Sequence, residues 1–163
     1  MRDRKGALLI ASAAFVLVGA GRPAKLPAAV AQAVEENRPG AEIDKLEIEK
    51  ESGLTLYDIE FKDGRGEIEV AEDGTVLDVT DIIDLKDVPP AAAAAIEKAA
   101  AGRRIKQVEK SEVRARIEKE GGQGRLSKLA TPECVYEAEL SRGEVEVAAD
   151  GRLIKGLKGE VKP

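Results

Sequence analysis

The stretch YDIEFKDGRGEIEVAEDGTVL, residues 57–77, decides the fold of this chain. Apolar Tyr57, Ile59 and Phe61 alternate with acidic residues, and the same alternation resumes at Ile68 after a glycine-rich turn. Strict alternation between glycine-containing turns is typical of antiparallel strands that bury one face. We therefore predict an antiparallel meander over this stretch.

The same pattern returns in YEAELSRGEVEVAADGRLI, residues 136–154. Ahead of the two copies lie the alanine-rich segments AAVAQAVEEN at 28–37 and AAAAAIEKAAAG at 91–102, each next to a proline that suits a first helical turn. A strand at 43–51 completes the first unit. The sequence therefore predicts an α+β protein of two repeats, 26–83 and 88–157, each with one helix packed on a four-stranded antiparallel sheet.

The second copy is longer between its first two strands, from Ile105 to Tyr136, than the first copy. The extra residues include a glycine-rich insertion at 120–133, which we expect to be an exposed loop. Long loops within small domains are often functional, so this loop is a candidate contact surface. A tolerated flexible extension is the alternative, as is one helical turn that docks on the domain itself. The candidate residues are Arg125, Leu126, Lys128 and Leu129.

These motifs together resemble the PepSY repeat: proline, an alanine-rich helix, a glycine stop, a strand, and then Tyr-x-[Ile/Ala]-x-[Phe/Leu] followed by Glu-[Ile/Val]-Glu-Val-x-x-Asp-Gly. More narrowly, the chain is similar to secreted PepSY-like proteins built on the tandem fold of the β-lactamase inhibitor protein. The resemblance implies a periplasmic or extracellular module that binds or inhibits another protein.

The N-terminus is typical of an export signal. A positively charged start, from Arg2 to Lys5, precedes the uncharged apolar run from Gly6 to Ala20. We predict a signal peptide over residues 1–20 and a periplasmic or extracellular location. The alternative is an uncleaved anchor, which is the one way we expect the chain to contact a membrane.

The composition excludes several functions. With 26 basic and 31 acidic residues and a net charge of −5, the chain is poorly suited to bind nucleic acid. Histidine is absent, which removes histidine-dependent catalysis and imidazole metal sites. We predict no enzyme, no catalytic or metal-binding residue and no cofactor. The single cysteine, Cys134, is expected to be a buried inert thiol rather than a reactive or intermolecular one.

Acidic residues occupy the strand positions that face away from the predicted helices. Solubility alone accounts for such a wet face, and in the second repeat Arg114 and Arg116 could pair with acids across strands. The functional hypothesis is a non-enzymatic module that binds a protein through this face and the 120–133 loop, with inhibition of a secreted or periplasmic hydrolase as one form. The alternative is a divalent-cation-binding or envelope-stress module. The candidate contact residues on this face are the arginines Arg114 and Arg116 and the acids Glu47, Glu49, Asp58, Glu60, Glu67 and Glu69. Asp78 shares the outward parity of the acids.

Overall fold

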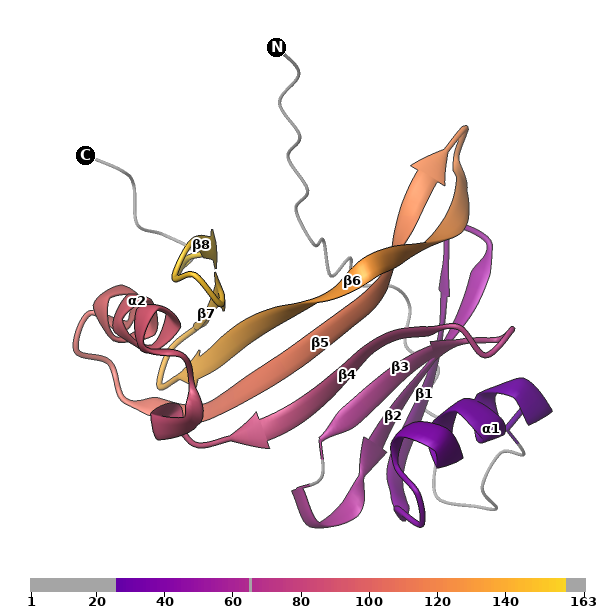
Figure 1. The fold of residues 1–163 in the computed structure, drawn as a ribbon, viewed down its shortest axis with the longest axis horizontal. Helices are drawn as coiled ribbons and strands as arrows, with labels where there is room; N and C mark the ends of the chain where they lie inside the picture. Colours follow the sequence, from indigo (N-terminus) through magenta and orange to yellow (C-terminus); the bar gives the residue numbers. More distant parts are fainter. Residues whose placement is uncertain (1–25, 65, 158–163) are drawn as a thin grey trace.

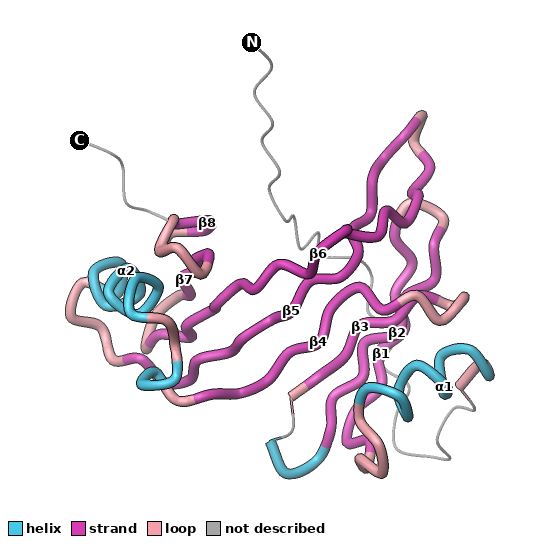
Figure 2. Tube along the Cα trace, in the orientation of Figure 1, coloured by secondary structure: helices cyan, strands magenta, loops and turns pink. Residues whose placement is uncertain are grey.

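The computed structural model describes residues 26–64 and 66–157, which form one antiparallel sheet and two α-helices (Figures 1 and 2). The predicted signal peptide lies outside these residues. Among them, no helix is long and apolar enough to cross a membrane. The elements are α1 (Ala28–Asn37), β1 (Ile43–Glu51), β2 (Leu54–Phe61), a 3-10 turn (Lys62–Gly64), β3 (Glu67–Ala71), β4 (Val76–Ile83), a second 3-10 turn (Leu85–Asp87), α2 (Pro90–Ala100), β5 (Ile105–Glu120), β6 (Gln123–Leu140), β7 (Glu144–Ala148) and β8 (Leu153–Lys155).

The eight strands follow one another across the sheet in chain order. Strands β4 and β5 pair from Asp78 opposite Val113 to Ile83 opposite Val108, so the two halves share one continuous sheet. The prediction of two repeats, each with a helix on its own four-stranded sheet, is therefore wrong. The backbone N–H and C=O groups along the edge of β4 form hydrogen bonds with β5. The alternation of apolar and polar residues does not show which strand pairs with that edge.

Both helices cover the same face of the sheet. Helix α1 packs on a core that includes Ile59 and Val79, and α2 packs on a core that includes Val108. On β4, Val79 and Ile83 share a face, and Ile83 lies opposite Val108. Figure 1 accordingly shows both helices outside the curve of the sheet, at its two ends.

The two Asp-Gly turns lie under the first turns of the helices. A Cβ atom on Gly151 would stand 2.6 Å from the carbonyl oxygen of Ala91, and one on Gly74 would stand 3.0 Å from that of Ala29. Both glycines also have positive φ, which other residues rarely adopt. Glycine is therefore required where each meander approaches its helix.

The segment predicted to be an exposed loop, residues 120–133, is largely a strand. Strand β6 begins at Gln123, after a turn of two glycines that follows β5 directly. The register of the two strands shifts at two places, near Lys106 and, by a larger step, where Arg114 on β5 faces residues 129–132 on β6. The prediction of a loop was wrong because the additional residues lengthen two paired strands, which satisfy each other's backbone groups.

Candidate functional site on the concave sheet face

The long β5–β6 hairpin curls the sheet until its tip meets the β1–β2 turn (Figure 1). The backbone N–H of Gly124 donates to the carbonyl oxygen of Ser52 at an N···O distance of 2.7 Å. Beside it, Lys119 and Glu51 form an ion pair with an N···O distance of 3.2 Å. We call this contact the clasp. It closes one end of the concave face, the face opposite the helices.

An apolar cluster fills the concave face next to the clasp. Leu126 and Ile117 from the hairpin pack against a cluster that joins Leu56 on β2 to Leu77 on β4. Strands β2 and β6 are not neighbours in the sheet, yet a Cβ atom on Gly124 of β6 would lie 3.1 Å from the Leu54 side chain on β2, so the sheet curls toward this face. The apolar cluster therefore lies on the concave face, and it excludes water from the part of that face next to the clasp.

The acidic ladder, as we call it, crosses four strands of this concave face. Glu47 on β1 lies opposite Asp58 on β2, Asp58 lies opposite Glu69 on β3, and Glu69 lies opposite Asp78 on β4. Residues directly opposite one another in antiparallel strands have Cβ atoms about 5 Å apart. Four carboxyl groups are thus aligned in one row, with Glu67 on the same face of β3.

Burial in this curled sheet raises the pKa values of the acids. The pKa of Glu69 rises to about 8, first because burial removes water and then because Asp78 and Asp58 repel its charge. Burial and then repulsion by Asp58 raise the pKa of Glu67 to about 8, and burial and then repulsion by Glu47 raise the pKa of Asp58 to about 6. Burial raises the pKa of Asp78 to about 6. At neutral pH, the ladder therefore holds protons that ordinary carboxylates would have lost.

A single base borders the ladder at its β1 end in the described part of the chain. The Nζ atom of Lys45 lies 2.8 Å from a carboxylate oxygen of Glu47 and 2.9 Å from one of Glu60. Within the described residues, Asp58, Glu69 and Asp78 have no ion-pair partner. The ladder is therefore uncompensated over three of its four strands.

Acids continue along the concave face into the second half of the sheet. Glu137 on β6 lies opposite both Glu109 on β5 and Glu146 on β7. Burial, then repulsion by Glu144 and Glu109, raises the pKa of Glu137 to about 7. Here Lys155 pairs with Glu144, so this region is more balanced than the ladder.

All six acids predicted from the sequence as contact residues lie on this concave face. The structure differs from the expectation in their environment, because the ladder acids are half-buried rather than fully wet. Alternation alone did not show that the sheet would curl over them. Asp78 belongs with them, and Lys45 is a functional candidate that the sequence analysis missed. The six are Glu47, Glu49, Asp58, Glu60, Glu67 and Glu69.

The predicted basic and apolar contact residues do not gather in one patch. Arg114 bonds to Asn37 at the end of α1 and to Glu112, on the face that the helices cover. Arg116 pairs with Glu133 and Arg125 pairs with Glu118, both at the surface. Leu126 belongs to the cluster at the clasp, as described above. Lys128 is exposed on β6, and Leu129 is half-buried within the bulge.

The carboxyl groups of the ladder do not form a recognisable metal centre. Within residues 26–64 and 66–157, no group of three or more histidine, cysteine or acidic side chains has an arrangement that could hold a metal ion. Cys134 is half-buried against the core of α2.

Solved structures of other proteins are similar to this fold, although no known sequence family matches the chain. No protein-family model matches the chain, and no curated protein sequence does. A DUF2874 family protein from Bacteroides ovatus has a similar structure, with a TM-score of 0.53 and 11% identity over 82% of this chain and 87% of that chain. A candidate periplasmic protein from Bacteroides eggerthii gives a TM-score of 0.50 and 10% identity over 81% and 88%.

A BLIP-like protein from Bacteroides fragilis gives a TM-score of 0.48 and 15% identity over 89% of this chain and 92% of that chain. This TM-score does not establish a shared fold. The predicted PepSY family and its tandem repeat are not confirmed by any of these matches. This chain therefore shares the fold of the DUF2874 protein and of the candidate periplasmic protein, and its own sequence carries the ladder.

Proposed function

We propose that this chain is an exported, non-enzymatic binding module whose concave sheet face receives a lysine- or arginine-bearing segment of another protein. The observation that carries the proposal is the acidic ladder, in which Asp58, Glu69 and Asp78 stand in a row and form no ion pair with any residue that the structure describes. A partner that supplies positive charge would remove the repulsion among them and would replace the water that burial has removed.

The spacing of the ladder defines the partner segment. Adjacent strands are about 4.8 Å apart, so the four acids span roughly 14 Å. Along an extended segment, residues of equal parity are about 7 Å apart. A segment that crosses the strands with basic residues at positions i, i+2 and i+4 therefore places three positive charges over the row.

Proton release is the distinctive consequence of this binding. The partly protonated carboxyl groups of Glu67 and Glu69, whose pKa is about 8, would ionise when a base approaches them. Binding should therefore release protons at pH 7 and should strengthen as the pH rises from about 6 to 8.

Isothermal titration calorimetry tests this proposal with a synthetic peptide that alternates lysine and threonine, measured in two buffers of different ionisation enthalpy. We expect saturable binding with proton release, and a loss of about tenfold or more in affinity in the double variant Asp58→Asn/Glu69→Gln. The matched control is Glu97→Gln, which removes an exposed acid from α2. Equal affinity in the double variant and the control would refute the proposal.

The proposal has two further parts: that the chain is exported, and that its binding inhibits another protein. The apolar run from Gly6 to Ala20 and the similarity to a candidate periplasmic protein support export. Inhibition of a secreted or periplasmic hydrolase rests on the sequence resemblance and on the availability of a concave face. The cation-binding alternative predicts that calcium alone raises the melting temperature, which the binding module described here does not.

A further inference from the structure

Strand β1 forms one edge of the sheet, and in the described part of the chain it pairs with β2 alone. On β2, the carbonyl oxygen of Thr55 accepts from the N–H of Glu72, on the side of β3. Thr55 lies opposite Lys50, so the backbone groups of Lys50 point away from β2. Backbone direction alternates along a strand, and the groups of Ile48 and Leu46 therefore point the same way. The outer edge of β1 offers these backbone groups to another strand.

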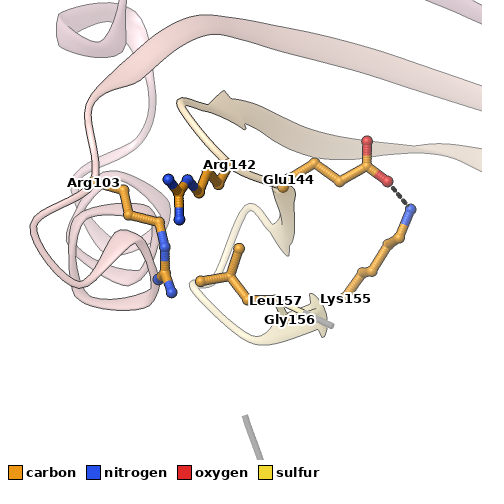
Figure 3. Close-up of a pocket in the computed structure, with 7 residues that line it drawn as sticks. Arg103, Arg142, Glu144, Lys155, Gly156 and Leu157 are labelled. Atoms are coloured by element: carbon orange, nitrogen blue, oxygen red, sulfur yellow. Dashed lines mark hydrogen bonds and ion pairs between the residues drawn. The ribbon is translucent and has the colours of Figure 1, made fainter. Parts of the chain in front are cut away.

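The opposite edge of the sheet offers much less. Strand β8 has only three residues. Figure 3 shows its Lys155 extended toward Glu144 of β7, and the two side chains form an ion pair. A short edge strand whose charge is already paired is typical of an edge that is protected against association. The longer edge, that of β1, is the one suited to pair with another strand.

The charges of β1 are complementary to those of the same strand turned end for end. Residues 44–50 read Asp-Lys-Leu-Glu-Ile-Glu-Lys. When a second copy of this strand runs antiparallel with Glu47 opposite Glu47, every other charge in these residues faces one of opposite sign. The facing residues are then Asp44 and Lys50, Lys45 and Glu49, and Leu46 and Ile48. Each of these pairs occurs twice in the symmetric arrangement.

Two of these charges have no ionic partner within one copy. Asp44 and Lys50 are exposed, and neither forms an ion pair among the residues that the structure describes. They lie about 20 Å apart along one strand, which is too far for them to pair within one chain. In the antiparallel arrangement, each of them meets its opposite charge on the other copy.

The neighbouring registers are less favourable. A two-fold axis at Ile48 would set Glu47 opposite Glu49 twice, which is repulsive. An axis at Leu46 would set Ile48 opposite a carboxylate. The axis at Glu47 gives one like-charge contact, between the two Glu47 side chains, and in each copy the Nζ atom of Lys45 lies 2.8 Å from a Glu47 oxygen. The charge pattern therefore selects the register about Glu47.

We propose that two copies of this chain form an antiparallel dimer through their β1 edges, with Glu47 of one copy opposite Glu47 of the other. Lysines and a bulge, such as the register shift between Ile43 and Lys45, often protect a sheet edge from pairing. Here both signs of charge stand at complementary positions, so they specify one partner and one register. The dimer goes beyond the proposed function, because it uses a strand edge, and it places two acidic ladders end to end.

Sedimentation velocity of the full chain tests the dimer, over concentrations from about 10 µM to 1 mM that suit a small interface. We expect a monomer–dimer equilibrium. Asp44→Lys and Lys50→Asp should each weaken the dimer about tenfold or more, because each change turns two attractive pairs into repulsive ones. The double variant Asp44→Lys/Lys50→Asp keeps the net charge of the wild type and should restore its affinity.

Disulfide formation tests the register, in a chain that also carries Cys134→Ala. Glu47→Cys should give a covalent dimer under mild oxidation, because facing Cα atoms are about 4.5 Å apart where two strands form no hydrogen bonds. The control is Glu49→Cys, whose counterpart would lie about 13 Å away along the strand. It should stay monomeric under the same conditions.

Three results would overturn the proposal. One is a monomer at every concentration. Another is a double variant that dimerises no better than the single variants, since the charges of Asp44 and Lys50 would then not meet. The third is equal cross-linking of the two cysteine variants, which would place the contact elsewhere.

Discussion

Replacing Glu69 with glutamine should stabilise the protein at neutral pH. Glu69 is at the centre of the ladder, between Asp58 and Asp78, and burial followed by their repulsion raises its pKa from 4.5 to about 8. At pH 7 the unfolded chain has this carboxyl group ionised, whereas folding forces it to take up a proton or to hold a buried charge. Glutamine has nearly the same shape and no charge, so it removes this cost.

The size of the effect follows from the pKa values. Each unit of pKa difference corresponds to about 1.4 kcal/mol, so at pH 7 the cost of protonating Glu69 is about 3.4 kcal/mol. Asp58 and Asp78 relax when their neighbour is neutral, and they share part of this cost. We therefore expect Glu69→Gln to increase the free energy of unfolding by about 1–3 kcal/mol at pH 7.

The sign of the pH dependence is determined by the direction of the shift. A carboxyl group whose pKa is raised on folding contributes full stability below its unfolded pKa and loses it as the pH rises to the folded pKa. The advantage of the variant should therefore be small at pH 4, grow between about 4.5 and 8, and then level off. Urea unfolding of wild type, Glu69→Gln and the control Glu97→Gln across this range measures it. An advantage that does not change with pH, or a loss of stability at pH 8, would refute the reasoning.

Three further predictions concern the fold at the clasp and beneath α2. Gly124→Ala should cost about 1–3 kcal/mol in the free energy of unfolding, because its Cβ atom would lie 2.9 Å from that of Ser52 at the clasp. Gly156→Ala is its control and should be nearly neutral in the same urea unfolding experiment, because there the added atom is 3.4 Å from the nearest side chain. Leu126→Ala should cost about 1–3 kcal/mol and should speed hydrogen exchange of the Gly124 amide, since it empties part of the cluster beneath the clasp; unchanged exchange would mean that the cluster does not hold the hairpin. Gly151→Ala should lower the melting temperature more than Gly124→Ala does, because its Cβ atom would be 2.6 Å from a backbone oxygen and its φ of 84° is unfavourable for alanine; the reverse order would show that α2 moves aside easily.

Local features of the fold could be predicted from the sequence, whereas the neighbours of each strand could not. The alternation around Ile59 and Ile68 correctly placed strands and their buried face, because period-2 patterning reports burial directly. The same pattern does not show that β4 pairs with β5. Any strand with free backbone N–H and C=O groups could form hydrogen bonds with the edge of β4 or with the edge of β5. The two units therefore looked separate when they share one sheet.

The residues of the candidate site could be predicted from the sequence, whereas their burial and their raised pKa values could not. Outward parity identified Asp58 and Glu69 as members of one acidic face. Their raised pKa values depend on the curl that brings Gly124 to Ser52, a contact between residues far apart in the chain. Residues 120–133 are rich in glycine, which suggested a loop. The neighbouring residues of β5 and β6 are mostly polar, so the apolar–polar alternation that indicates a strand is weak there.

The most direct test of the ladder as a binding surface is an NMR titration of the side-chain carboxyl groups of Asp58, Glu67, Glu69 and Asp78. In the free protein we predict midpoints near 6 for the two aspartates and near 8 for the two glutamates. Adding the lysine–threonine peptide at pH 7 should convert the glutamate signals to their ionised form. Midpoints near 4 for all four groups, with no response to the peptide, would contradict the account.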